Sequence, residues 1–233
     1  LQENYQYNDA EEAADVAREL AAGFDFGNRE VEVALVRFFD EFDPSRLYPT
    51  AWWTDALKQF GDPRQAFDTA LRSIFSAVFS FSLPCRQALA GLAAFCGKRM
   101  ASYGSGSGYW EWLLANHHGL EVSCHDLTLR HRFLPMQMAS HADAYVAGDT
   151  TIFLAWLPGD AAIDADIESL LGRLKPGQKL VLVGESDDNG HPRTCATQRF
   201  FRYLRHNFEH QATLPLVNYA YLEDRIDLLV KRY

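Results

Sequence analysis

The sequence predicts an α/β fold in which a Rossmann-like, mostly parallel sheet follows an N-terminal segment made only of helices. Two observations predict it. Residues 1–82 carry helical patterns alone, whereas from Leu83 onward short β-rich runs alternate with helical stretches. Strands that alternate with helices form βαβ units, which give parallel strands joined by right-handed crossovers. We therefore expect a helical segment over residues 1–82 that packs on the core, and a Rossmann-like domain over residues 83–233.

The N-terminal segment shows four helical patterns with start and stop signals. Asp9 can cap the first helix, and Gly23 stops it. Asp62-Pro63 places a cap before a proline at the first position of the last helix. The expected helices are Ala10–Ala22, Arg29–Phe42, Thr50–Phe60 and Pro63–Phe81. Their aromatic side chains are expected to be core or docking contacts.

The second part supplies the strands and the crossover helices, and Gly97, Gly119 and Gly148 mark helix ends. The expected helices are Pro84–Cys96, Tyr109–His118, Met136–Ala147, Ile163–Leu174 and Thr197–Asn207. The expected strands are Arg99–Tyr103, Glu121–His125, Thr151–Trp156, Lys179–Gly184, His210–Leu216 and Arg225–Lys231.

Connection lengths predict two further features of the sheet. The last two strands are joined by a connection too short for a crossover helix, so they should pair antiparallel. Ala144–Asp149 runs almost directly into the strand at Thr151, which leaves no room for a third parallel strand followed by a crossover helix. The third strand is therefore expected to be short, near Leu127–Phe133, or missing.

Composition excludes several classes of protein. Of 233 residues, 48% are hydrophobic and 23% charged, which is ordinary globular usage and excludes a disordered chain. No apolar run is long enough to span a membrane, and the polar stretch Leu1–Asp9 shows no secretory signal. The net charge of −9 disfavours DNA or RNA as a partner. It also favours burial of the aromatics in residues 199–206 over their stacking on single-stranded nucleic acid.

The cysteines indicate a reducing compartment and no metal site. They are Cys85, Cys96, Cys124 and Cys195. They lie far apart and form no C-x-x-C pair, so we expect free thiols and a cytoplasmic location. Zinc needs closely spaced ligand pairs, and the adjacent His117 and His118 do not face one ligand position from a helix.

A glycine-rich loop between the first strand and its crossover helix is the main functional pattern. Gly104, Gly106 and Gly108 allow positive φ and close approach of a ligand to the backbone. The loop lies at the carboxyl end of a strand and before a helix N-terminus, where open α/β sheets bind polar or anionic groups. Asp126 ends the second strand 20 residues after Gly106, where an acid can accept hydrogen bonds from both hydroxyls of a ribose.

The glycine spacing discriminates between two nucleotide cofactors. A dinucleotide site favours G-x-G-x-x-G, whose third glycine would fall at Tyr109. Here the third glycine is Gly108, one place earlier, which fits S-adenosylmethionine better than a nicotinamide dinucleotide. The alternative is a purely structural glycine turn before a helix.

The loop also carries a resemblance to a known family. Tyr103–Leu114, Y-G-S-G-S-G-Y-W-E-W-L-L, resembles motif I of class I S-adenosylmethionine-dependent methyltransferases, in a poorly characterised branch that reads E-I-G-A-G-T-G-Y-W. The likeness spans roughly residues 83–233, and its further stretches are Val122–Asp126, Ile152–Pro158, Leu180–Glu185 and Arg225–Arg232. It implies seven strands in the order 3-2-1-4-5-7-6, with strand 7 antiparallel.

Three departures from that family stand out. Ser102 occupies the place of the family's acid two residues before the first glycine, a carboxylate that usually helps organise the loop. Trp156-Leu157-Pro158 replaces the W-P-P element. The acid that recognises adenine after the third strand cannot be identified.

Position and resemblance together nominate the site residues. The residues expected to bind the cofactor are Gly104, Ser105, Gly106, Gly108, Tyr109, Asp126 and Trp156. Those expected to serve catalysis are Trp156, Glu185 and His125, at the carboxyl ends of the fourth, fifth and second strands. Methyl transfer needs an aligned nucleophile, and a nitrogen or oxygen acceptor can need a base. In the alternative interpretation, Trp156 is a packed wall, Glu185 caps a turn, His125 is a core histidine, and Tyr109 buries against the sheet.

The resemblance implies an S-adenosylmethionine-dependent methyltransferase whose acceptor is a small molecule or a protein side chain. One alternative is a catalytically inactive methyltransferase-like binding or scaffold protein, in which the N-terminal helices serve a partner or a homodimer. Another is an NAD-dependent oxidoreductase, which Tyr109 at the third-glycine place disfavours.

Overall fold

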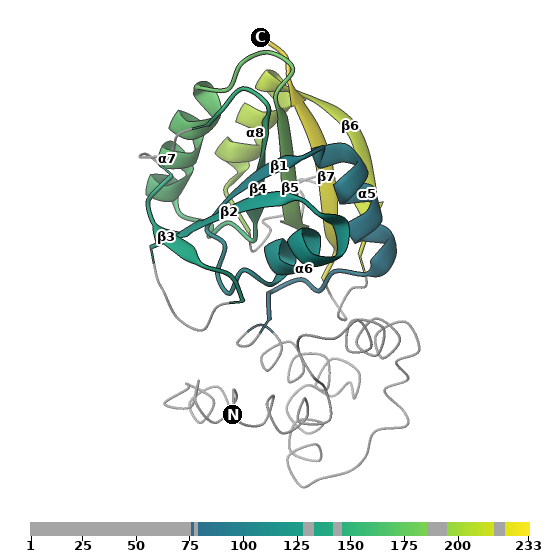
Figure 1. Ribbon diagram of the computed structural model, residues 1–233. Coiled ribbons are helices and arrows are strands. Elements are labelled where there is room, and N and C mark those ends of the chain that lie inside the picture. The colour runs from purple at the N-terminus through teal and green to yellow at the C-terminus, as the bar shows by residue number, and fades with distance from the viewer. Residues whose placement is uncertain (1–75, 77–78, 128–132, 142–145, 186–194, 217–221) are drawn as a thin grey trace, which may run out of the picture. The chain divides into compact units, whose positions relative to one another are not determined.

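The computed structural model describes residues 76, 79–127, 133–141, 146–185, 195–216 and 222–233 (Figure 1). The chain divides into two compact units. One comprises Leu1–Leu83 and Val217–Leu222, and the other Pro84–Leu216 and Glu223–Tyr233. The helices predicted over Ala10–Ala22, Arg29–Phe42 and Thr50–Phe60 lie outside the described residues. The fourth predicted helix, Pro63–Phe81, ends before Phe81: Ser76 is helical, whereas Phe79 lies in a turn.

The second unit is built on one mixed sheet. Its described residues form seven strands in the order β3-β2-β1-β4-β5-β7-β6. The strands are β1 Arg99–Tyr103, β2 Glu121–Asp126, β3 Met136–Met138, β4 Thr150–Ala155, β5 Lys179–Glu185, β6 Phe208–Pro215 and β7 Asp224–Lys231. Strands β1 to β5 pair parallel, and β7 pairs antiparallel with both β5 and β6. The predicted α/β class, strand order and antiparallel end of the sheet are confirmed.

Two of the four helices of the second unit, α7 and α8, begin at a residue whose side chain caps them. The helices of this unit are α5 Arg86–Cys96, α6 Tyr109–His118, α7 Ala161–Gly172 and α8 Gln198–Asn207. The carboxylate of Asp160 accepts hydrogen bonds from the first amides of α7, and the hydroxyl of Thr197 accepts one from Phe200 N–H in α8. Gly119 adopts the left-handed conformation that ends α6.

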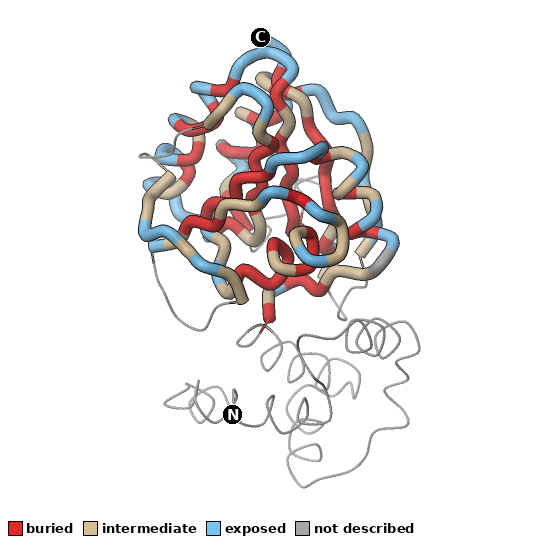
Figure 2. The backbone as a smooth tube through the Cα atoms, in the orientation of Figure 1, coloured by how far each residue is buried: buried red, intermediate tan, exposed pale blue. Residues whose placement is uncertain are grey.

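The sheet is covered by helices on both faces (Figure 1). Helices α7 and α8 share one apolar cluster with alternate residues of β1, β4 and β5, among them Tyr103, Leu154 and Leu182. The intervening residues face the other side, where the ring of Trp110 in α6 lies 5.9 Å from that of Phe153 in β4. Because side chains alternate along a strand, both faces of the central strands are apolar. Figure 2 shows this as buried stretches along the central strands.

The third strand corrects one prediction. A helix was expected over Met136–Ala147, but Met136–Met138 form strand β3, and neither Ala139–His141 nor Val146–Ala147 is helical. Strand β3 pairs in parallel with Cys124–Asp126 of β2. Pairing with an exposed sheet edge has therefore overridden the helical preference of methionine and glutamine. The third strand is short, as expected, but it begins at Met136 rather than near Leu127–Phe133.

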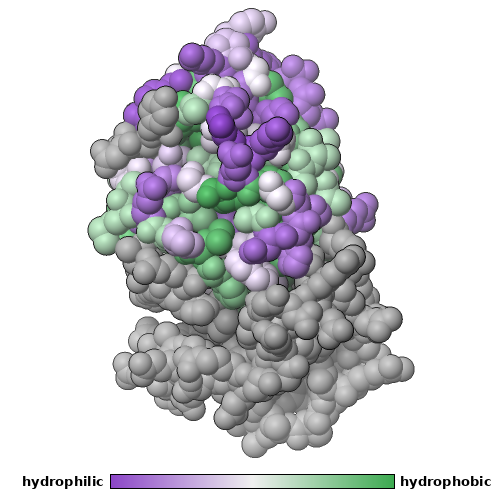
Figure 3. Space-filling model, in the orientation of Figure 1, coloured by the Kyte–Doolittle hydropathy of each residue, from purple (hydrophilic) through white to green (hydrophobic). Residues whose placement is uncertain are grey.

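Within the described part of the chain, no helix is long and apolar enough to cross a membrane. On the face of the second unit seen in Figure 3, hydrophilic side chains gather toward the end that carries the C-terminus, and hydrophobic ones form a band across the middle.

Candidate functional site

The glycine loop follows β1 and leads directly into α6. Gly104, Gly106 and Gly108 have φ of 73°, 57° and 74°, all in the left-handed region. A Cβ atom added at Gly106 would meet no atom within 4 Å, so the backbone conformation, and not crowding by the protein, requires glycine there. The amides of Gly104 and Ser105 both donate to the carbonyl oxygen of His125, at 2.8 and 3.1 Å. The loop is thus fastened to the end of β2 and leaves open space above Gly106.

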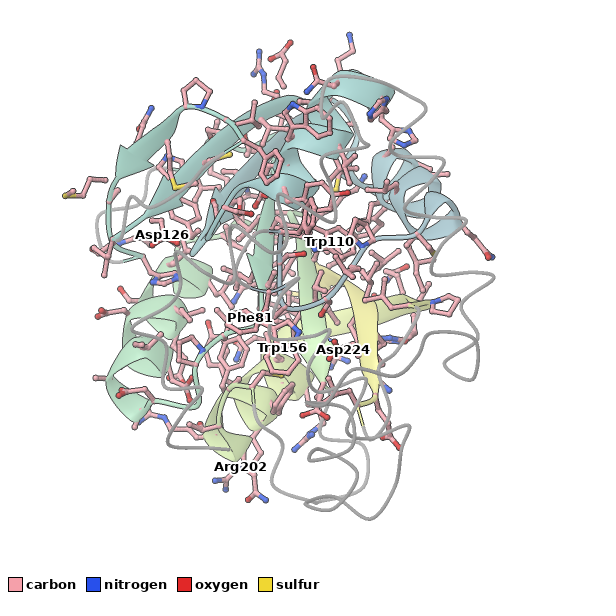
Figure 4. All side chains as sticks on the ribbon, turned by 90° about the horizontal axis from the view of Figure 1, so that it is seen from below. Phe81, Trp110, Asp126, Trp156, Arg202 and Asp224 are labelled. Atoms are coloured by element: carbon pink, nitrogen blue, oxygen red, sulfur yellow. The ribbon has the colours of Figure 1, made fainter. Side chains whose placement is uncertain are left out.

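Asp126 lies against this loop. It is the last residue of β2 and half-buried, and its Oδ2 atom accepts a hydrogen bond of 2.8 Å from the N–H of Gly106. In the view onto the strand ends in Figure 4, Asp126 lies at the rim of the sheet. A carboxylate has about four acceptor positions, so one can accept several hydrogen bonds.

A chain of hydroxyl groups connects the loop to α6. The N–H of His125 donates to Ser105 Oγ at 3.1 Å, and Ser105 Oγ donates to Ser102 Oγ at 2.9 Å. Ser102 Oγ in turn donates to Glu111 Oε1. Glu111 is 2% exposed, and its burial raises the pKa of its carboxyl group to about 7, although the bond from Ser102 opposes this rise. The structure therefore brings a carboxyl group to Ser102, where the sequence alone shows none.

His125 is packed beneath the loop. Its Nδ1 lies 3.0 Å from the carbonyl oxygen of Ser102, so Nδ1 carries the proton and donates it to that oxygen. Its ring stacks on Tyr103 with a centroid distance of 4.4 Å and an interplanar angle of 12°. These contacts favour a core histidine that fixes the strand ends, and a catalytic role for His125 stays a prediction.

His141, which was not among the predicted site residues, adds a ring nitrogen near the loop. Its Nε2 would lie 3.8 Å from a Cβ atom at Gly104. This atom is buried and has no hydrogen-bond partner among the described residues. Burial lowers the pKa of His141, while Asp166 and Asp126 oppose that shift. The neutral imidazole is thus favoured beside the loop.

A second group of side chains lies at the same edge of the sheet, after β4 and β5. Trp156 follows β4 with φ of 49°, and its N–H donates to the carbonyl oxygen of Val183 at 2.9 Å. Its indole Nε1 donates to Asp224 Oδ2 at 3.3 Å. Asp224 begins β7 directly opposite Glu185, the last residue of β5, and the two are 3% and 4% exposed. Figure 4 shows Trp156 and Asp224 side by side.

The two groups follow neighbouring strands, because β1 and β4 are paired in the sheet. The structure brings Asp126 and the glycine loop together, and it joins Trp156 to Glu185 through Asp224. Tyr109, the first residue of α6, is buried, and its ring lies 5.1 Å from that of Phe133. Its predicted contact with a cofactor stays a prediction.

Sequence reasoning missed Glu111 and Asp224. Glu111 is the third residue of α6, a position from which a glutamate can reach back toward the helix start. Asp224 could have been found from the antiparallel direction of the last strand, which starts where the parallel strands end. Within the described residues, no group of three or more histidine, cysteine or acidic side chains is placed to hold a metal ion.

Comparisons with known proteins give likenesses of fold at low identity. No protein-family model and no curated protein matches the chain. Among solved structures, the N-methyltransferase NodS from Bradyrhizobium japonicum WM9 is 14% identical, with 62% of this chain and 93% of that chain covered and a TM-score of 0.46. An O-methyltransferase of neocarzinostatin biosynthesis is 14% identical, with 85% and 68% covered and a TM-score of 0.47. A S-adenosylmethionine-dependent methyltransferase from Methanosarcina mazei is 13% identical, with 60% and 96% covered and a TM-score of 0.46. What this chain does is therefore inferred from its own residues.

Proposed function

We propose that the chain is an S-adenosylmethionine-dependent methyltransferase that acts on a small molecule or a protein side chain. The observation that carries this proposal is the carboxylate of Asp126 beside the open backbone at Gly106. The two lie at the carboxyl edge of a sheet with the strand order 3-2-1-4-5-7-6. An acid beside a glycine loop at this edge suits a nucleoside, whose ribose offers two hydroxyl donors.

The residues of the loop fit an adenosyl ligand. Asp126, which already accepts the N–H of Gly106, would also accept hydrogen bonds from the ribose hydroxyls. Gly106 has no side chain to block approach, and α6 begins directly behind the loop with its first amides facing the edge. When bound, S-adenosylmethionine would supply an electrophilic methyl group on a sulfonium centre.

We assign the acceptor side to Trp156, Asp224 and Glu185. The indole of Trp156 offers a flat apolar wall that Asp224 holds by one hydrogen bond. A carboxylate next to the acceptor could take the proton that a nitrogen or oxygen nucleophile loses. Alignment of the nucleophile would supply most of the rate, because little covalent chemistry is asked of the protein.

The thiols support a cytoplasmic location and no thiol chemistry. All four described cysteines are free. Burial raises the pKa of Cys96, Cys124 and Cys195 to about 12 each, so these thiols stay protonated and unreactive at neutral pH. Free thiols suit a reducing compartment.

Isothermal titration calorimetry tests the proposed function. The purified protein is titrated with S-adenosylmethionine, S-adenosylhomocysteine and NADH. We expect binding of the two adenosyl ligands, a large loss of that binding in Asp126→Ala, and no response to NADH. If no adenosyl ligand binds, the proposed function is wrong. If S-adenosylmethionine binds but no methyl group reaches any of a broad panel of acceptors, the chain is a binding protein instead of an enzyme.

A further inference from the structure

Glu111 is an acidic side chain buried inside the second unit and connected to the glycine loop. Its Oε1 atom accepts the hydroxyl of Ser102, and the carboxyl group also contacts its own backbone N–H. No cation approaches it among the groups that shift its pKa. Burial of a carboxyl group without a cationic partner costs folding free energy, so its hydrogen bonds are what stabilise it there.

The connections run in one direction. Ser105 Oγ accepts the N–H of His125 and donates to Ser102 Oγ at 2.9 Å, closer than the carbonyl oxygens of Ser102 and His125 at 3.3 Å each. Ser102 Oγ in turn donates to Glu111 Oε1. Each hydroxyl has one proton, so each link fixes the orientation of the next. The carboxyl group of Glu111 is the final acceptor and therefore sets the direction of this series of hydrogen bonds. Without it, Ser102 Oγ would lose this acceptor, and the hydroxyl of Ser105 could turn to the carbonyl oxygen of Ser102 or His125.

These side-chain hydrogen bonds add to the backbone bonds that hold the loop. Ser105 lies between Gly104 and Gly106, and it contacts the end of β2 through both its amide and its hydroxyl. The amide of Gly106, the next residue, is the one that meets Asp126. An altered orientation of Ser105 would thus move the atoms that face a ligand.

We propose that Glu111 is a positioning residue, which acts through Ser102 and Ser105 to hold the glycine loop in its ligand-binding shape and makes that shape depend on proton concentration. Its effect on affinity rests on the proposed function, whereas its effect on the loop does not. An ionised Glu111 accepts the bond from Ser102 more strongly than a protonated one. The loop is therefore tighter at higher pH.

The surroundings of Glu111 place this change in the neutral range. From β2, the carboxylate of Asp126 raises the pKa of Glu111, and Cys124, also on β2, interacts with Glu111 but stays protonated. From β1, the hydroxyl of Ser102 lowers it. Burial is the largest influence, and the resulting pKa is about 7. A positively charged ligand would favour the ionised form, so its binding would release a proton from Glu111.

Amide hydrogen exchange of the ligand-free protein tests the effect on the loop. Exchange at Gly104, Ser105 and Gly106 is measured from pH 6 to pH 8 and corrected for its intrinsic pH dependence. Glu111→Gln keeps a hydrogen-bond acceptor without charge, and Glu111→Leu keeps the bulk without an acceptor. Ser102→Ala removes the hydroxyl group that links Ser105 to Glu111. Glu209→Gln makes the same chemical change at an exposed site on β6, at the other edge of the sheet.

In the wild type and in Glu209→Gln, we expect loop protection to rise severalfold with pH. In Glu111→Gln, the protection of the loop amides should be the same at every pH. In Glu111→Leu and Ser102→Ala, that protection should be about tenfold lower than in the wild type, which is the scale of one hydrogen bond. Unchanged protection in Ser102→Ala, or a wild-type pH dependence in Glu111→Gln, would overturn the proposal.

Calorimetry in buffers of different ionisation enthalpy tests the effect on binding. We expect S-adenosylmethionine to release about half a proton from the wild type at pH 7, because a group with a pKa of about 7 is half protonated there, and none from Glu111→Gln. Equal proton release from both would contradict the proposed coupling. If the wild type binds no adenosyl ligand, the proposed function fails, and the exchange measurement still decides the role of Glu111.

Discussion

The carboxylate of Asp126 accepts a hydrogen bond from the amide of Gly106 at 2.8 Å. This bond joins the ends of β1 and β2, two neighbouring parallel strands, and it orients an acid toward the space above the loop. A single side chain therefore shapes the loop and offers acceptors to a ligand.

Substitution of Asp126 should weaken nucleoside binding more than it weakens the fold. We expect Asp126→Ala to reduce affinity for S-adenosylhomocysteine by roughly 10–100-fold, the scale of hydrogen bonds to a charged group. Asp126→Asn keeps one acceptor and should lose less. Calorimetric titration measures the affinities, and thermal unfolding measures the stability. Equal affinities in the wild type and Asp126→Ala would rule out the assigned role.

A methyl group at Gly106 should block the ligand as well as strain the loop. Gly106 has φ of 57°, so Gly106→Ala should cost about 1–2 kcal/mol of stability. Gly177 is a matched control, because it also has positive φ and no atom within 4 Å of an added Cβ. It precedes β5 and so lies at the amino end of a parallel strand, away from the glycine loop. We expect Gly177→Ala to lose similar stability in urea unfolding and to bind normally. Normal binding by Gly106→Ala would show that no ligand approaches this point.

Glu111 should make the protein less stable as the pH rises. Its carboxyl group titrates near 4.5 when unfolded and at about 7 when folded. Between these values the unfolded chain has lost the proton that the folded protein retains, so the free energy of unfolding falls from pH 4.5 to pH 7 and is level above it. The expected loss is about 3 kcal/mol. Urea unfolding of the wild type and Glu111→Gln at pH 5 and pH 8 measures it, and a difference between the two proteins that does not change with pH would contradict it.

Thr197 should stabilise the contact between α7 and α8. Its hydroxyl accepts the N–H of Phe200 at 3.3 Å and donates to the buried carboxylate of Asp164. Thr197→Ala removes a helix cap and leaves Asp164 without this donor, so we expect a loss of about 2–3 kcal/mol in chemical unfolding. Thr197→Ser keeps the hydroxyl and should restore most of it. A loss in Thr197→Ser as large as that in Thr197→Ala would assign the effect to the methyl group instead.

Most of the sheet could be predicted from the sequence because its signals are local. β5 contains the continuous apolar run Leu180–Val183, and the short connection before β7 predicts an antiparallel pair. Helix α7 was expected from Ile163 but begins at Ala161, after the capping Asp160. The error at Met136–Met138 has a physical reason. Whether three residues pair with the edge of β2 depends on a strand elsewhere in the chain, which no local pattern reports.

The candidate site was predictable where it depends on backbone, and much less so where it depends on contacts. The positive φ of Gly104, Gly106 and Gly108 follows from their residue type. The contact of Ser102 with Glu111 does not, because nine residues separate them and a helix has to turn the carboxyl group back toward the strand.

The position of β7 between β5 and β6 has a consequence for how the domain is made. β6 is synthesised first, yet among the described strands it pairs only with β7, so it has no place in the sheet until β7 has left the ribosome. A nascent chain halted before Asp224 would expose the apolar edge of β5 and invite aggregation. Deletion of β7 should therefore be far less tolerated than the loss of a single short strand suggests.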